Sequence, residues 1–286
     1  KQKNVGIILW STWYAITRDT EALCAKYAAM GIKGFKVDFL DRNDQKMIAS
    51  CYTLAEAAAR HQLLLDLHGV FPPQGLQRTW PNVVNFEGVR GMEYMKWNAD
   101  SRVPAHAVTL PFIRMMAGPM DYTPGAMRNS TKGTAAASQS LPVGMGTRCN
   151  QMAMYVVYEA PLQMLADNPT AYIKEQECTN FISQVPTVFD ETLPLDAQLG
   201  EYIVMARKKE KTWYIGAMTN WTERDISIDA AFLGAGEFEA VIFKDGVNAN
   251  KNATDYKKEI ISLNAADKIP VHLAQGGGCV IRITQK

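Results

Sequence analysis

Short apolar runs alternate with longer amphipathic stretches through the first part of the chain. Residues 5–10, 34–40, 63–67, 83–86 and 107–110 are mainly apolar, and the first of these runs contains β-branched side chains, as buried strands do. Apolar residues recur at helical spacing over residues 19–30 and 44–60. Strands that are apolar on both faces and alternate with helices predict a parallel sheet of βα units.

The loops that follow these strands are long and carry polar and aromatic residues. Long loops at one end of every strand favour a (β/α)8 TIM-type barrel with its site at the C-terminal face, and a doubly wound sheet stays open as an alternative. The pattern gives five strands and a weaker sixth at residues 163–166, whereas a barrel needs eight. We therefore expect the N-terminal strands of the barrel to be absent from this chain.

The pattern changes after a helix predicted at residues 149–160 and another at 170–184. From residue 188 onward short β segments follow one another at even spacing, with turn signals such as Asp245-Gly246 between them. The predicted strands are residues 202–206, 212–219, 225–228, 238–243, 259–263 and 278–283. This spacing predicts a C-terminal all-β sandwich. The sequence therefore divides into a barrel part, residues 1–187, and a sandwich domain, residues 188–286.

Composition and charge remove several classes of function. The 286 residues are 47% hydrophobic and 21% charged, with a formal net charge of +1, so no bulk charge favours nucleic acid or an anionic membrane. The longest apolar run, residues 5–16, is too short for a membrane span of about 20 residues. Five cysteines without a close pair predict neither a zinc site nor a disulfide framework.

Asp38 stands at the end of an otherwise apolar predicted strand, with Lys36 two residues earlier on the same face. A carboxylate is costly to bury unless it is paired, and the C-terminal end of a barrel strand is where catalytic groups lie. Asp38 is thus a candidate nucleophile and Lys36 a candidate donor to substrate hydroxyls. The alternative is a Lys–Asp pair that only satisfies itself.

Glu87 and Glu93 follow the next-but-one strand and flank two glycines, which let the backbone turn so that the carboxylates converge. Converging carboxylates are stable around a hard cation such as Ca²⁺, or if one keeps its proton and acts as a general acid. Two solvated loop glutamates are the alternative. His68 follows a strand directly, where a substrate-binding or orienting role competes with a purely structural one. No Gly-x-Ser-x-Gly elbow, Walker loop or dinucleotide fingerprint is present.

Several ordered motifs resemble glycoside hydrolase family 97 along the chain from about residue 4 to its end. They are Gly34-Phe35-Lys36-Val37-Asp38-Phe39-Leu40-Asp41-Arg42, Asp66-Leu67-His68-Gly69, Trp80-Pro81-Asn82-Val83, Glu87-Gly88-Val89-Arg90-Gly91-Met92-Glu93-Tyr94, Thr109-Leu110-Pro111-Phe112 and Gly118-Pro119-Met120-Asp121-Tyr122-Thr123-Pro124-Gly125. The resemblance implies a calcium-dependent α-glycosidase with an N-terminal β-sandwich domain, a catalytic (β/α)8 barrel and a small C-terminal β domain. It further implies that this chain lacks the N-terminal domain.

The family has two branches, and two positions decide between them. The inverting α-glucosidase branch lacks the strand-end Asp and has a Glu after the His of the next strand, whereas this chain has Asp38 and Gly69. Both positions resemble the retaining α-galactosidase branch. Carried over, Asp38 is the nucleophile, Glu93 the general acid and base as well as a calcium ligand, and Glu87 a further calcium ligand. Lys36 and His68 bind substrate.

The resemblance therefore implies a retaining exo-α-galactosidase that acts on small or oligosaccharide substrates with a terminal α-galactosyl residue. Three alternatives remain open: a β-L-arabinopyranosidase, an inverting α-glucosidase, and a noncatalytic carbohydrate-binding protein whose acidic residues hold a structural calcium ion. By analogy with bacterial glycan-degrading enzymes we expect a periplasmic or secreted protein.

Overall fold

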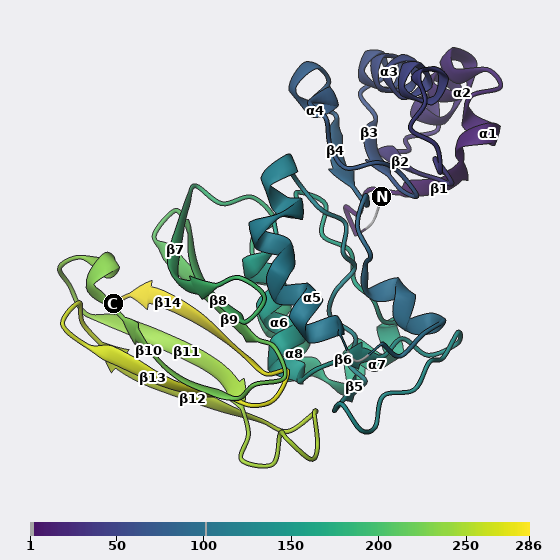
Figure 1. Cartoon of the computed structure of the whole chain (residues 1–286). Coiled ribbons are helices and arrows are strands. Elements are labelled where there is room, and N and C mark those ends of the chain that lie inside the picture. The colour runs from purple at the N-terminus through teal and green to yellow at the C-terminus, as the bar shows by residue number, and fades with distance from the viewer. Residues whose placement is uncertain (1–2, 101) are drawn as a thin grey trace. The chain divides into compact units, whose positions relative to one another are not determined.

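The computed structural model describes residues 3–100 and 102–286, which form two compact units (Figure 1). The first unit comprises the described residues up to Gly91 together with Arg114–Tyr122 and Ala160–Leu162. The second comprises the described parts of Met92–Ile113 together with Thr123–Glu159 and Gln163–Lys286. The predicted division at residue 187 coincides with neither unit's limits and stays a prediction about domains.

The first unit is a four-stranded parallel sheet with the strands in sequence order (Figure 1). The strands are β1 Ile8–Thr12, β2 Gly34–Asp38, β3 Leu64–Leu67 and β4 Val83–Phe86. The helical segments are α1 Trp13–Ile16, α2 Thr20–Ala29, α3 Gln45–Arg60, α4 Leu76–Thr79 and the 3₁₀ turn η3 Arg114–Ala117. The parallel sheet of βα units predicted for this region is confirmed.

Helix α3 shows why the local sequence folds in this way. The Asp44 carboxylate accepts hydrogen bonds from the backbone N–H groups of Lys46 and Met47, which caps the first turn. One face of the helix then buries Met47, Cys51 and Leu54 in the same apolar core as the strand residues. Along the strands, alternate residues such as Phe35, Val37, Leu65 and Leu67 enter that core. The opposite face of the sheet is left to the residues between them.

The second unit contains a six-stranded antiparallel sheet in the order β12-β11-β14-β9-β8-β7 and a two-stranded sheet of β10 with β13 (Figure 1). The strands are β7 Glu191–Gln198, β8 Tyr202–Lys209, β9 Thr212–Thr219, β10 Arg224–Asp229, β11 Phe238–Asp245, β12 Tyr256–Leu263, β13 Lys268–Leu273 and β14 Gly278–Gln285. Residues of β10 and β13 share one apolar core with the six-stranded sheet. The sandwich-like arrangement predicted for the C-terminal region is confirmed.

The rest of the second unit is mainly helical. It comprises η1 Met92–Lys96, α5 Val103–Thr109, η2 Leu110–Phe112, the short parallel pair β5 Asn129–Ser130 and β6 Gly144–Met145, α6 Arg148–Val157, α7 Pro169–Lys174, α8 Gln176–Ile182 and η4 Ala231–Leu233. All ten residues of α6 are buried, and the helix packs against β9 and β14. Among the described residues no helix combines the length and apolar character that a bilayer crossing requires.

Three predicted elements are wrong in detail. Residues 107–110 are helical, because Pro104 begins α5 in the first turn, where a missing N–H costs nothing. Residues 163–166 form no strand. The helix predicted over residues 170–184 is divided into α7 and α8 at Glu175.

Besides the two-residue strands β5 and β6, two strands of the C-terminal sheets escaped the sequence pattern, β7 and β13. Each contains a proline, Pro194 and Pro270, which argues against a strand in sequence terms. Both tolerate it because β7 is an edge strand and β13 pairs with β10 alone.

Candidate active site

The carboxylate of Asp38 is held by two donors at the C-terminal end of β2. Its Oδ2 accepts a hydrogen bond from Trp10 Nε1 at 3.0 Å, and its Oδ1 accepts one from the backbone N–H of Phe39 at 2.7 Å. Phe39 has φ +66°, a left-handed conformation that is rare for a bulky residue and recurs at functional sites. The side chain of Trp10 is 55% exposed, so the carboxylate lies at an accessible surface of the first unit.

A row of polar residues crosses the sheet beside Asp38. The strand register aligns Trp10 with Lys36, Lys36 with Asp66, and Asp66 with Asn85. The register shift after Leu65 brings Asn85 level with Asp66. Asp66 and Asn85 are fully buried. Burying polar side chains at the centre of four parallel strands costs free energy unless they have hydrogen-bond partners. The face that carries this row is therefore the candidate site for chemistry or recognition.

Lys36 is held between two buried carboxyl groups. Its Nζ lies 2.7 Å from Asp121 Oδ2 and 3.5 Å from Asp66 Oδ2. Burial alone would lower the pKa of Lys36, but the charges of Asp121 and Asp66 outweigh it and raise that pKa. Burial and the charge of Asp121 raise the pKa of Asp66 well above its usual range. Of the two aspartates beside Lys36, Asp66 is thus the one whose neutral form is favoured.

Asp121 is the ionised member. Burial would raise its pKa, but the hydrogen bond with His68 and the charge of Lys36 outweigh burial and hold the pKa well below its usual range. His68 Nε2 lies 3.1 Å from the same oxygen, Oδ2, that receives Lys36. Since an ionised carboxylate only accepts hydrogen bonds, this contact favours the tautomer of His68 that carries a proton on Nε2.

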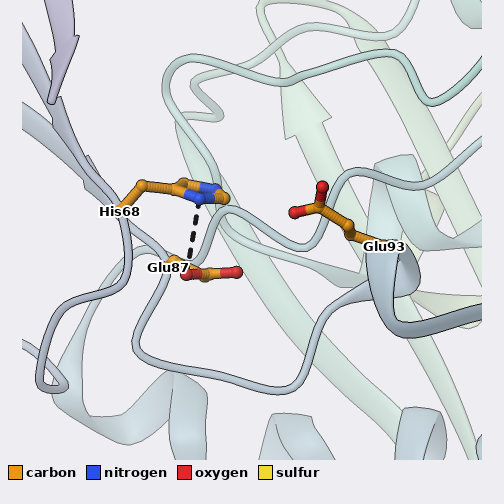
Figure 2. Close-up of side chains that lie close together, drawn as sticks. All are labelled: His68, Glu87 and Glu93. Atoms are coloured by element: carbon orange, nitrogen blue, oxygen red, sulfur yellow. Dashed lines mark ion pairs between the residues drawn. The ribbon is translucent and has the colours of Figure 1, made fainter. Parts of the chain in front are cut away.

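The other ring nitrogen of His68 faces the remaining carboxylates. Nδ1 lies 3.4 Å from Glu87 Oε2 and 3.9 Å from Asp38 Oδ1. Figure 2 shows the ring of His68 and the Glu87 carboxylate joined by this ion pair. Burial would lower the pKa of His68, but the hydrogen bond with Asp121 and the nearby carboxylates raise it. His68 thus links Asp121 on one side to Glu87 and Asp38 on the other.

Glu87 follows β4 and is fixed by its backbone neighbours. Its Oε2 accepts the backbone N–H of Gly69 at 2.7 Å, and burial raises its pKa despite this bond and the charge of His68. The loop is held by Arg114, whose buried guanidinium donates to the carbonyl oxygens of Phe86, Glu87, Gly88, Gly118 and Pro119. This Arg joins the segment that carries Glu87 to the one that leads to Asp121.

Glu93, also labelled in Figure 2, lies on η1 of the second unit. Its Oε1 accepts a hydrogen bond from Lys96 Nζ at 2.9 Å, and its side chain is 39% exposed. Tyr94 and Trp97 on the same turn form an edge-to-face pair with centroids 5.6 Å apart, and both are exposed. The Glu93 turn therefore offers a carboxylate beside exposed aromatic rings.

Four of the five predicted site residues, Lys36, Asp38, His68 and Glu87, lie together on one face of the first unit, and Glu93 lies on the second. Arg114 was missed at the level of sequence, and Asp66 and Asp121 stood out only as parts of the quoted motifs. Asp66 carried the same signal as Asp38, a carboxylate within an apolar strand. Nothing local to Arg114 or Asp121 marks them, because their partners lie far away in sequence.

Comparison with protein-family models gives two matches. Residues 1–89 match the model described as Glycoside hydrolase 97, and residues 188–284 match Glycosyl-hydrolase 97 C-terminal, oligomerisation. The chain belongs to glycoside hydrolase family 97. The resemblance in the sequence motifs is confirmed.

Relatives of this chain support its assignment to family 97. It is 52% identical over 98% of its length to a protein of Bacteroides thetaiotaomicron named retaining alpha-galactosidase, of which it covers 43%. A family 97 enzyme from Pseudoalteromonas sp. strain K8, solved with acarbose, matches all of the chain with a TM-score of 0.90 at 32% identity, over 47% of its own length. A beta-arabinopyranosidase structure matches 98% of the chain with a TM-score of 0.82 at 25% identity, over 46% of its own length. The chain thus spans less than half the length of these relatives.

Proposed function

We propose that the protein carrying this chain is a retaining exo-α-galactosidase that removes terminal α-galactosyl residues by double displacement. The observation that carries the proposal is Asp38, an accessible carboxylate at a strand end whose two oxygens are oriented by Trp10 and by the Phe39 amide. A carboxylate held in one orientation is suited to attack a single carbon atom. The relative named retaining alpha-galactosidase supports the choice of sugar.

The residue after His68 supports retention over inversion. Gly69 has φ +53°, and a Cβ added there would lie 2.7 Å from Asp41 Oδ1 and 3.2 Å from the Phe39 nitrogen. A Glu at this position, as in the inverting branch, would therefore require the Asp41 side chain to move and would strain the backbone. Without that base, the carboxylate available to act on the anomeric carbon is Asp38.

In the proposed mechanism an Asp38 oxygen attacks the anomeric carbon while the bond to the leaving oxygen breaks, and Glu93 gives its proton to that oxygen. In the second step Glu93 takes a proton from a water molecule, whose oxygen attacks the same carbon and releases Asp38. Retaining enzymes hold the two carboxyl groups about 5–5.5 Å apart, and this spacing stays a prediction for Asp38 and Glu93. Lys36 and His68 donate to hydroxyl groups of the sugar.

We also propose that Glu87 and Glu93 belong to a Ca²⁺ site. Carboxylate oxygens are the ligands that Ca²⁺ prefers, and burial raises the pKa of Glu87, so a nearby cation would favour its ionised form. Ca²⁺ takes six to eight oxygen ligands, so other segments would complete the set. When bound, the ion would supply positive charge that fixes the orientation of these carboxylates.

The proposal includes the rest of the predicted architecture. The four parallel strands would form part of a (β/α)8 barrel, completed by strands outside this chain, and a β-sandwich domain would precede it. Coverage of less than half of the relatives supports this. We propose a periplasmic or secreted location by analogy with bacterial glycan-degrading enzymes, which cell fractionation would test.

Proton NMR of the first sugar released from an aryl α-D-galactoside tests the function, with Ca²⁺ and again with a chelator. We expect α-galactose first, and loss of its release on chelation. β-Galactose first would refute retention. Release that is indifferent to the chelator would refute the Ca²⁺ role. Sugar binding without release from the folded protein would favour a noncatalytic carbohydrate-binding protein.

A second measurement tests the nucleophile. Asp38→Gly should abolish turnover of a galactoside with a good leaving group, and azide should restore it by forming a β-galactosyl azide in the space left by the carboxylate. Asp41→Gly, a change at an aspartate three residues away, is the matched control and should not show azide rescue. A folded Asp38→Gly protein that azide fails to rescue would count against the role of Asp38.

A second substrate is favoured by one observation, the match to a beta-arabinopyranosidase structure. β-L-Arabinopyranosides present the ring hydroxyl pattern of α-D-galactosides and lack the exocyclic hydroxymethyl group. A ratio of kcat/KM values for the two aryl glycosides distinguishes them, and we expect it to favour the galactoside.

A further inference from the structure

The polar face of the first unit contains a buried carboxylate, that of Asp121, to which the proposed reaction assigns no role. Asp121 Oδ2 receives both Lys36 Nζ at 2.7 Å and His68 Nε2 at 3.1 Å. The side chain of Asp121 is completely buried, whereas that of Lys36 is 21% exposed and that of His68 is 8% exposed. The anion thus lies beneath two donors that reach toward the surface.

We propose that Asp121 is a positioning residue that fixes Lys36 Nζ and the His68 ring for hydrogen bonds with the hydroxyl groups of one sugar ring. The inference rests on the proposed function, because it assigns sugar hydroxyls to these two side chains. A lysine has four rotatable bonds and a histidine ring can turn over, so neither donor is oriented by its own backbone alone. Sharing one carboxylate oxygen restricts both at once and sets the spacing between them.

The position of Asp121 itself is fixed from two directions. Its backbone N–H donates to the carbonyl oxygen of Phe86 at 2.8 Å, which ties it to the end of β4. Arg114, at the other end of the same segment, donates to the carbonyl oxygens of Gly118 and Pro119 on the way to Asp121. The carboxylate is therefore held by backbone that lies against the strand ends.

The neighbouring Asp66 provides a matched comparison. Both aspartates are completely buried beside Lys36, but Asp66 Oδ2 is 3.5 Å from Nζ, where Asp121 Oδ2 is 2.7 Å away. No contact of Asp66 with His68 is as close as the 3.1 Å bond to Asp121 among the described residues. Burial also raises the pKa of Asp66, so an amide is close to its own neutral state. Asp→Asn should therefore cost much more at Asp121 than at Asp66.

The first measurement needs no activity. The chain has four histidines, and ¹⁵N labelling of their rings in the full protein, assigned with His68→Gln, reports which nitrogen of His68 carries a proton. We expect a slowly exchanging proton on Nε2 that Asp121→Asn removes and Asp66→Asn retains. A proton on Nδ1 alone in the wild-type protein overturns the inference, even if Asp121→Asn does not fold.

The second measurement uses aryl α-galactosides that each lack one ring hydroxyl. In the wild-type protein, loss of a hydroxyl read by Lys36 or His68 should lower kcat/KM by about ten- to a hundredfold. In Asp121→Asn the parent substrate should fall by a similar factor, and the additional penalty for that analogue should shrink to less than about threefold. A residue that is merely structural lowers every substrate equally and leaves the penalty unchanged.

Asp245→Asn is the matched control, because Asp245 is a buried aspartate of the second unit and lies outside the proposed site. It should leave the pattern of hydroxyl penalties as in the wild-type protein. If Asp121→Asn shows the same pattern as this control, the inference is wrong. If the wild-type protein hydrolyses no α-galactoside, the proposed function is wrong, and the NMR result alone decides whether Asp121 holds His68.

Discussion

Replacing Arg114 by lysine tests how the site is held together. The Arg114 guanidinium donates to five backbone carbonyl oxygens, at distances of 3.0–3.1 Å, and its residue is 7% exposed. Lysine keeps the charge but has three donors on one nitrogen, so it leaves at least two of these carbonyls without their partner. A buried acceptor that loses its donor costs about 1–3 kcal/mol. We expect Arg114→Lys to destabilise the first unit by about 3 kcal/mol.

Amide hydrogen exchange measures this loss locally, which matters because a chain of two units need not unfold in one step. The amides to follow are those of Glu87, bonded to the Leu67 carbonyl oxygen, and Asp121, bonded to that of Phe86. A loss of about 3 kcal/mol corresponds to exchange that is about a hundredfold faster. Amides of the six-stranded sheet in the second unit should keep their protection.

The control is Arg60→Lys. Arg60 lies on the exposed side of α3 and pairs with Glu21 and Glu56, and lysine can form comparable surface ion pairs. It should leave the exchange of both amides unchanged. If Arg114→Lys behaves like Arg60→Lys, with exchange within about threefold of the wild-type rate, the five bonds do not hold the loop and the reasoning is refuted.

Three further changes have defined outcomes. Gly88→Ala should destabilise the protein by about 2 kcal/mol in urea unfolding, because φ is +42° and the added Cβ meets loop backbone at 2.8 Å, whereas Gly133→Ala, with open space around it, should not. Burial raises the pKa of Asp245 to about 6 from 3.8, so it stabilises the fold below about pH 4 and loses this contribution, up to about 3 kcal/mol, as pH rises through 6. Asp245→Asn should remove that fall from unfolding curves measured between pH 4 and 7, and an unchanged fall would assign it to another group. Trp10→Phe keeps the ring but removes the donor to Asp38 Oδ2, so kcat should fall about tenfold, and a change below twofold would show that the Phe39 amide suffices.

The strands and the two longer helices of the first unit, α2 and α3, could be predicted because their signals are local. Apolar runs gave β2, β3 and β4 within two residues of their observed bounds, and helical spacing over residues 44–60 gave α3. Period-two alternation along a strand is enough to place Lys36 and Asp38 on one face. Strands β7 and β13 could not be predicted, because the prolines in their sequences argue against a strand locally. Whether these segments form strands depends on the neighbours with which they pair.

The site, too, has features that the sequence predicts and features that depend on residues distant in sequence. Asp38, His68 and Glu87 follow neighbouring parallel strands, so their convergence at one edge of the sheet follows from topology. The pKa shifts of His68 and Glu87 do not follow from topology, because both depend in part on Asp121, which is 53 residues from His68 in sequence. Asp66 could have been found by the argument used for Asp38. That its pKa is raised while that of Asp121 is lowered follows only from its burial and from its greater distance to Lys36.

The segment Arg114–Tyr122 therefore determines whether the polar face can exist at all. It belongs to the first unit although residues on both sides of it belong to the second, and the Arg114 bonds and the Asp121–Phe86 bond anchor it to the strand ends. Without it, the strands would keep their apolar core, but Lys36 and His68 would lose the ionised carboxylate that they share. A partly buried lysine without that anion is costly, and Lys36 would turn toward solvent or lose its proton. The βα pattern thus builds the sheet, and a segment outside that pattern supplies the buried carboxylate that pairs with Lys36 and His68 on one of its faces.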